Sequence, residues 1–301
     1  MKRYIMLISL LLMGYIMVVG QETTPTVICA QGKVLESLSF HSKILGRDVK
    51  YSIYLPPDYS TSSRSYPAVY LLHGYTDNET AWVQFGEVNR YANQAIAAGE
   101  IPSMIIVMPD AGVTWYVNDY LGKTRYEDMF MQELIPYMEQ TYRIRAAKEF
   151  RGISGLSMGG YGSLVYSLHH PDMFAACVAF SAAVWTDDEI ISMDPKQYDG
   201  WLSSLYGPAK TPKDRLSDHY RKNSVLDLVK AIPEAHKKDV RFYIDCGDDD
   251  FLYRGNSALH VLMRDLNIPH EYRTRDGEHS WVYWRTGITD GLKFIGMSFH
   301  R

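Results

Sequence analysis

A serine flanked by glycines is the sharpest chemical motif in the sequence. Residues 155–159 read Gly-Leu-Ser-Met-Gly, a G-x-S-x-G run, with a short apolar stretch at 150–153 before it and a helical pattern from residue 158 onward. A tight turn between a strand and a helix presents a serine hydroxyl above a sheet, and glycines keep side chains out of the strained turn. The motif predicts that Ser157 is a nucleophile.

A serine hydroxyl becomes a good nucleophile only when a base removes its proton and an acid orients that base. After a strand–turn–helix motif of this kind, the chain order is serine, acid, histidine. His279 follows the last predicted strand, at 270–274, and is the only histidine in the expected place. We interpret the other nine histidines as structural or exposed: His41, His73, His169, His170, His219, His236, His260, His270 and His300.

The acid is not selected by position alone. The strand predicted at 240–244 ends in a run of carboxylates, Asp245, Asp248, Asp249 and Asp250. Such a run is also typical of a solvated turn, and it could bind a hard cation such as Ca²⁺.

An acyl-transfer site also needs two backbone N–H groups aimed at the developing negative charge. One should come from the residue after the nucleophile, Met158. The other should come from the loop after an early strand, where Tyr75 follows His73 and Gly74. We therefore predict an oxyanion hole formed by the amides of Tyr75 and Met158.

These residues must be positioned by a repeating series of elements. Short apolar runs predict strands at 67–72, 103–108, 150–153, 176–180, 240–244 and 270–274. Helical patterns lie between them, at 89–98, 126–141, 158–169, 256–266 and 281–299. This alternation predicts an α/β fold with a mostly parallel central sheet and helices on both faces.

Two segments depart from that alternation. Residues 38–55 have the alternating character of an antiparallel hairpin. Residues 185–238 contain no strand of the series, and their Pro, Gly and aromatic residues predict an insertion or lid before the acid-bearing strand. We expect residues 21–301 to form a single domain that includes this insertion.

The first twenty residues have the pattern of a secretory signal peptide. Lys2 and Arg3 precede an apolar stretch at 4–19, and small residues lead to a cleavage position before Gln21. A retained membrane anchor is the alternative, because the apolar stretch is just short of a full span. Cleavage of residues 1–20 would give a secreted or periplasmic protein without stable membrane association.

The composition excludes several classes of protein. The chain has 301 residues, a formal net charge of −4 and a pI near 6.2, which argues against a nucleic-acid binder. Its three cysteines are too few and too scattered for a disulfide scaffold or a zinc site. We expect no metal or cofactor in the reaction. The aromatic content of 13% has no explanation at this level.

Several motifs together resemble the esterase branch of the α/β-hydrolases, over about residues 38–299. That branch includes feruloyl and acetyl-xylan esterases of carbohydrate esterase family 1, S-formylglutathione hydrolases (esterase D-like) and mycolyltransferases. The matching segments lie at 70–74, 108–112, 133–136, 155–160, 246–250 and 277–281. The family's acid aligns with the last Asp of the Cys-Gly-x-x-Asp stretch, so the resemblance implies the α/β-hydrolase fold and Asp250 as the acid.

The export signal favours the branch that acts on plant polysaccharides. The resemblance implies a secreted serine carboxylic-ester hydrolase that needs no cofactor and releases hydroxycinnamic acids from plant xylan as a feruloyl esterase. The alternatives are an acetyl-xylan or general short-chain carboxylesterase and, further off, an S-formylglutathione hydrolase, an acyltransferase or a non-catalytic glycan-binding protein. Its partners would be small-molecule or oligosaccharide esters, such as feruloylated or acetylated xylan fragments.

A flat phenolic acyl group calls for apolar and aromatic walls beside the serine. The candidates lie in the 110s loop, in the insertion and beside the base. The main ones are Trp115, Tyr116, Trp185, Trp201 and Trp281, with Tyr198, Tyr206 and Trp284 as further members.

Overall fold

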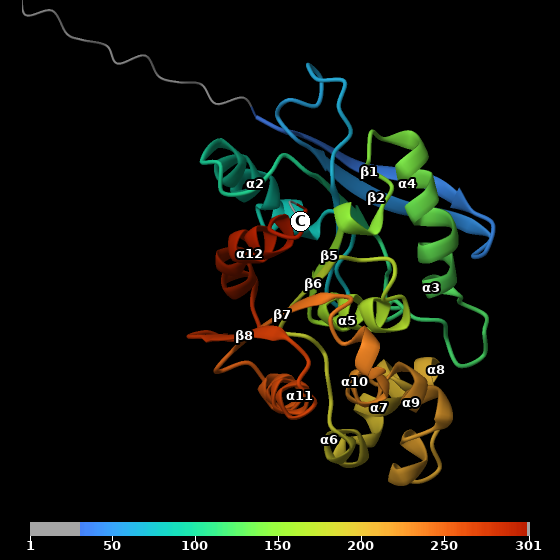
Figure 1. The fold of residues 1–301 in the computed structure, drawn as a ribbon. Helices are drawn as coiled ribbons and strands as arrows, with labels where there is room; N and C mark the ends of the chain where they lie inside the picture. Colours follow the sequence, from blue (N-terminus) through green and yellow to red (C-terminus); the bar gives the residue numbers. More distant parts are fainter. Residues whose placement is uncertain (1–30, 300–301) are drawn as a thin grey trace, which may run out of the picture.

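A twisted eight-stranded sheet forms the centre of the protein (Figure 1). The structure is a computed structural model that describes residues 31–299. The strand order is β1-β2-β4-β3-β5-β6-β7-β8. The strands are β1 (Lys33–Ser42), β2 (Arg47–Leu55), β3 (Ala68–Leu72), β4 (Ile105–Pro109), β5 (Arg151–Leu156), β6 (Ala176–Phe180), β7 (Arg241–Gly247) and β8 (His270–Arg275).

The predicted fold class is confirmed. The strands β1 and β2 form the expected antiparallel hairpin, and β2 pairs antiparallel with β4. Every other pairing, from β4 to β8, is parallel. The carboxyl ends of the parallel strands therefore meet at one edge of the sheet, where residues far apart in the chain can form a site.

Helices cover both faces of the sheet, as predicted (Figure 1). The helices α2 (Val88–Ala97) and α12 (Trp281–Gly296) pack on one face. The opposite face carries α5 (Met158–His169), α11 (Tyr253–Asp265) and a helical stretch from 126 to 141.

The side chains of the buried strand β3 contribute alternately to two hydrophobic cores, one on each face of the sheet. Val69 and Leu71 belong to the α2–α12 core, whereas Tyr70 and Leu72 belong to the α5 core, because successive side chains of a strand point to opposite faces. All four are fully buried, and burial of an aliphatic side chain contributes about 1.5–3 kcal/mol.

The helix predicted at 126–141 consists of three consecutive segments. These are α3 (Tyr126–Met129), a π-helical turn η1 (Phe130–Leu134) and α4 (Ile135–Thr141). Pro136 lies in the first turn of α4, where its missing N–H removes a hydrogen bond to the preceding turn. The last predicted helix also ends earlier than expected, at Gly296 rather than 299.

The segment 185–238 contains no strand within the described residues, in agreement with the sequence pattern. It folds into short helices: α6 (Asp187–Ser192), α7 (Pro195–Trp201), α8 (Ser203–Tyr206), η3 (Pro212–Arg215), α9 (Asp218–Asn223), α10 (Val225–Ala231) and η4 (Glu234–His236). Side-chain caps begin several of them; for example, Thr186 and Glu189 form a capping box on α6. Tyr161 of α5 anchors the segment through hydrogen bonds to the Tyr206 hydroxyl (2.8 Å) and the Asn223 carbonyl (2.9 Å).

Two short helices and one long loop complete the fold. The helices are α1 (Ala81–Gln84) before α2 and η2 (Lys148–Phe150) before β5, and the loop 111–125 lies between β4 and α3. The predicted signal peptide lies outside the described residues. Within 31–299, none of the helices combines the length and apolar character needed to cross a bilayer.

Candidate active site

Ser157 lies on the turn between β5 and α5, with φ 54° and ψ −116°. This backbone conformation is sparsely populated for a residue with a side chain and costs on the order of 1–3 kcal/mol. The chain passes very close to itself here, because a Cβ on Gly159 would lie 2.5 Å from the Leu72 carbonyl oxygen. The glycine therefore permits the approach that exposes Ser157, as the motif predicted.

A histidine and an aspartate complete a connected row with Ser157. His279 Nε2 lies 3.0 Å from Ser157 Oγ, and His279 Nδ1 lies 2.8 Å from Asp250 Oδ2. Because a carboxylate only accepts, Nδ1–H donates to Asp250 and leaves the Nε2 lone pair to accept from the serine hydroxyl. This is the geometry of a nucleophile, a base and an orienting acid.

The four candidate aspartates differ in their surroundings. Asp250 is fully buried and is the one that contacts His279. Asp245 is also buried, but it forms an ion pair with Arg275. Asp248 is exposed and accepts the amide N–H of Gly277 (3.0 Å). Asp249 is exposed beside it, so the geometry favours Asp250.

The surroundings of Asp250 keep it ionised. Burial by itself raises the pKa of this carboxyl group, but the His279 imidazole opposes that effect through a hydrogen bond and its charge. The Leu252 amide (2.8 Å) and the Ser181 hydroxyl also donate to it. The net pKa of Asp250 is therefore below its ordinary value, which suits a group that must remain negative beside an imidazole.

Two aromatic rings hold the imidazole of His279. The centroids of the Phe251 and Trp284 rings lie 4.5 Å and 4.8 Å from that of His279. Trp284 also donates its indole N–H to the Ser181 hydroxyl (2.9 Å). Sequence reasoning missed Phe251 and Ser181; the only available signal for Phe251 was its position directly after the aligned acid.

The peptide between Gly74 and Tyr75 has a defined orientation. His73 Nδ1–H donates to the Gly74 carbonyl (2.7 Å), and His73 Nε2 accepts from the Ala111 amide (2.9 Å). In a trans peptide the carbonyl and the next N–H point in opposite directions, so the Tyr75 N–H points away from His73. Sequence reasoning placed His73 in this loop without assigning it that orienting contact.

The second predicted oxyanion donor, Met158, is the first residue of α5. The first amides of a helix have no acceptor within it, and they lie at the positive end of the helix dipole. The side chain of Met158 is buried in the α5 core, so only its backbone is suited to the predicted role.

A cavity of about 360 Å³ opens around Ser157 and His279. Its wall is largely aromatic and includes Tyr75, Trp115, Trp185, Trp201, Phe251, Trp281 and Trp284. The ring of Trp115 lies 5.3 Å from that of Trp185 and 5.6 Å from that of Tyr75, and its indole N–H donates to the Trp201 carbonyl (3.0 Å). Four of the five main aromatic candidates thus line one cavity.

The fifth candidate, Tyr116, does not line this cavity, which corrects that prediction. Trp115 and Tyr116 are consecutive residues with positive φ, 56° and 64°. Trp115 lines the cavity, while Tyr116 is fully buried and donates its hydroxyl to the His73 carbonyl (3.0 Å). Tyr198 and Tyr206 are likewise buried outside the cavity, with their hydroxyls bonded to Gly207 and Tyr161.

One carboxylate lines this largely aromatic cavity. Asp77 lines the cavity, and burial raises its pKa, although the His73 ring and the Gly74 backbone act in the opposite direction. A carboxyl group in such a place can bind a substrate hydroxyl. Sequence reasoning did not single it out.

Residues 42–295 match a family model named Esterase, described as "Putative esterase". The chain belongs to this esterase family. The match to an esterase family agrees with the predicted carboxylic ester hydrolase and does not favour the alternative of a non-catalytic glycan-binding protein.

Solved and curated relatives agree with this assignment. A ferulic acid esterase structure superposes on the esterase with a TM-score of 0.74 and 32% identity, covering 89% of this chain and all of that one. An endo-1,4-beta-xylanase/feruloyl esterase of Xylanibacter ruminicola is 32% identical over 54% of this chain and 23% of its own length. An acetyl esterase of Caldicellulosiruptor saccharolyticus is 24% identical over 86% of this chain and 96% of its own.

Two esterases of Mycobacterium tuberculosis strains are 27% identical over 80% of this chain. The chain spans about half of their length, 54%.

Proposed function

We propose that this esterase is an exported feruloyl esterase that releases hydroxycinnamic acids from plant xylan. The observation that carries the proposal is the aromatic cavity of about 360 Å³ that opens directly onto Ser157 and His279. A phenylpropenoid acyl group can lie flat against such walls. An acetyl group would leave most of them without contact.

The proposed reaction is acyl transfer to water. Ser157 Oγ attacks the ester carbonyl carbon while His279 Nε2 takes its proton, and the amides of Tyr75 and Met158 bind the oxyanion. Collapse of this intermediate breaks the bond to the sugar oxygen, which receives the proton from His279. Water, deprotonated by His279, then attacks the acyl-enzyme. Collapse of this second intermediate breaks the bond to Ser157 Oγ, which takes the proton back from His279, and the hydroxycinnamic acid leaves. Asp250 orients the imidazole and stabilises its charged form throughout.

The substrate contacts that we propose are Trp115, Trp185, Trp201 and Trp281. Asp77 offers a polar contact for a hydroxyl group of the substrate. The similarity to a ferulic acid esterase along 89% of the chain supports this substrate class.

The second candidate is an acetyl-xylan or short-chain carboxylesterase. It is favoured by the similarity to an acetyl esterase, which extends over nearly the whole length of both chains.

A comparison of methyl ferulate with 4-nitrophenyl acetate separates the two candidates. We expect the purified enzyme to prefer methyl ferulate in kcat/KM, and to release ferulic acid from feruloylated xylo-oligosaccharides. A strong preference for the acetate, together with release of acetate but no ferulate from xylan fragments, would establish the second candidate instead.

Export is a separate part of the proposal. It is supported by the basic, then apolar, then small-residue pattern of the first twenty residues. Expression of the full chain and N-terminal sequencing of the product should give a chain that begins at Gln21. A product that retains Lys2 and Arg3 would exclude cleavage.

A further inference from the structure

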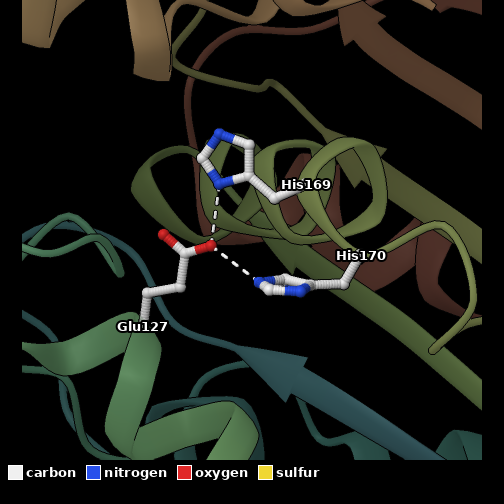
Figure 2. Close-up of side chains that lie close together, drawn as sticks. All are labelled: Glu127, His169 and His170. Carbon is white, nitrogen blue, oxygen red and sulfur yellow. Dashed lines mark hydrogen bonds and ion pairs between the residues drawn. The ribbon is translucent and has the colours of Figure 1, made fainter.

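Two histidines and a glutamate converge at the end of α5 opposite to Ser157. Glu127 of α3 extends toward His169, the last residue of α5, and toward His170, which follows it (Figure 2). Glu127 Oε1 lies 2.7 Å from His169 Nδ1 and 2.9 Å from His170 Nε2. Neither the proposed reaction nor the cavity around Ser157 involves these residues.

The outer nitrogen of His169 is anchored to the backbone. His169 Nε2 lies 2.9 Å from the carbonyl oxygen of Lys222 in α9. A carbonyl only accepts, so the proton on this side belongs to Nε2, and Nδ1 is the nitrogen directed at the cluster. Metal-binding histidines commonly have their second N–H held by a carbonyl in this way.

The cluster is partly enclosed but reachable from solvent. One ligand atom from each residue lies within 4.8 Å of the other two. The side chains of Glu127, His169 and His170 are 10%, 22% and 35% exposed. The cluster also lies at the carboxyl end of a twelve-residue helix, where the helix dipole favours a positive charge.

We propose that Glu127, His169 and His170 bind one divalent ion of the zinc class. Its ligands are Glu127 Oε1, His169 Nδ1 and His170 Nε2, with water in the remaining position. Two imidazoles and one carboxylate suit Zn²⁺ rather than Ca²⁺ or Mg²⁺, which prefer oxygen ligands.

The two contacts between the imidazoles and the Glu127 carboxylate need only a small adjustment to accept the ion. With bonds of about 2.0–2.1 Å, the ligand atoms of a tetrahedral zinc lie roughly 3.3 Å apart. The two ring–carboxylate contacts of 2.7 and 2.9 Å therefore open by about half an ångström on binding. The partly exposed His170 can supply much of this movement through side-chain rotation.

The ion would join three parts of the fold. Glu127 belongs to the helix that follows the 111–125 loop, the histidines end the helix that starts after Ser157, and Lys222 belongs to the 185–238 segment. Twelve helical residues span about 18 Å, so the ion is too far from Ser157 to act on the ester. We assign it a stabilising role in the folded protein.

Isothermal titration with Zn²⁺, after removal of metals with a chelator, tests the site. We expect one site in the wild-type protein, and affinity lower by at least about tenfold in His170→Gln, since even indirect ligand contacts are worth about that much. Glu127→Gln provides a second variant of nearly the same shape in case the first does not fold. His260→Gln is the matched control, because His260 lies 2.8 Å from His270 in a separate histidine pair; this variant should bind Zn²⁺ like the wild type.

Thermal unfolding supplies an independent measurement. Saturating Zn²⁺ should raise the Tm of the wild type and of His260→Gln by several degrees, but not that of His170→Gln. Three outcomes would overturn the proposal: no saturable binding, equal affinity in wild type and His170→Gln, or an equal Tm increase with Ca²⁺. The first two outcomes would leave the three side chains as a hydrogen-bonded ion pair only, and the third would exclude a site selective for the zinc class.

Discussion

Each end of helix α5 lies beside a histidine that contacts a buried carboxylate. At the amino end, His279 lies between Asp250 and the hydroxyl of Ser157. At the carboxyl end, His169 lies between Glu127 and the carbonyl of Lys222. The two carboxylates are similarly buried and similarly close, so the difference lies in the third group.

A hydroxyl can donate, whereas a carbonyl can only accept. His279 Nε2 can therefore keep a lone pair for the serine proton, while His169 Nε2 must carry a hydrogen for Lys222. The first arrangement is suited to moving a proton. The second fixes the ring, with Nδ1 directed at a carboxylate, and is suited to holding a cation.

The surroundings of the two histidines differ in the same sense. His279 is packed between Phe251 and Trp284 and opens onto the aromatic cavity. The His169–His170 cluster lies apart from that cavity, at the surface. A histidine–carboxylate contact alone therefore does not identify a catalytic pair; its third partner and the adjoining space do.

The largest effect should come from Ser157→Ala. Removal of the hydroxyl leaves His279 nothing to deprotonate, so kcat for 4-nitrophenyl acetate should fall by about 10⁴-fold or more. Circular dichroism and Tm should stay close to those of the wild type. If a chelator abolished hydrolysis and this substitution did not, the assignment of catalysis to the amino end of α5 and of cation binding to its carboxyl end would be wrong.

Asp250→Asn should lower kcat by about 10³–10⁴-fold, because an amide neither fixes the useful tautomer of His279 nor stabilises its charge. Asp248→Asn, at an exposed neighbour, is the matched control and should stay within about twofold, as expected for a surface position. Equal losses in both variants would contradict the assignment of the acid.

The stability of the wild type and that of Asp250→Asn should respond differently to pH. The folded-state pKa of Asp250 is lowered, so its ionised form stabilises the protein above the unfolded-state pKa of about 3.9, and this stability is lost as pH falls through the folded-state value. Urea denaturation should show a stability gap between wild type and Asp250→Asn that is larger at neutral pH and narrows in acid. A gap independent of pH would show that the Asp250 charge does not contribute.

Trp201→Ala should lower activity on a substrate with a large aromatic acyl group more than on one with a small acyl group. Loss of one aromatic wall should reduce kcat/KM for methyl ferulate by about 10–100-fold, on the order of 1.4–3 kcal/mol of contact. The smaller 4-nitrophenyl acetate should lose much less. Parallel losses on both substrates would indicate a general disturbance of the site rather than a binding wall.

Tyr116→Phe should give the smallest effect. It removes only the hydrogen bond to the His73 carbonyl, so we expect a loss of about 0.5–1.5 kcal/mol in unfolding free energy. The ratio of ferulate to acetate activity should not change, because this ring lies outside the cavity. A changed ratio of ferulate to acetate activity would show that Tyr116 does contribute to substrate binding.

Local pattern was sufficient for the features that depend on short stretches of chain. The buried runs of β3 to β7 specify strands, and the glycines around Ser157 specify the turn that presents it, because each depends on the backbone and burial of neighbouring residues. The position of His279 after the last strand followed from the order of elements. Local pattern did not predict boundaries such as the π-helical turn in 126–141, since these depend on packing around Pro136.

The tertiary structure decided what depends on partners distant in the chain. Position alone left four aspartates open, and the resemblance chose Asp250; burial and contact distinguish it from the others, because its partners His279 and Ser181 are brought to it by the order of β6, β7 and β8 in the sheet. Trp115 and Tyr116 are adjacent aromatic residues that the sequence does not distinguish. Two consecutive positive φ angles place the Trp115 ring in the cavity wall and the Tyr116 ring in the core. Glu127 meets His169 and His170 across 42 and 43 residues, a separation that no local periodicity encodes.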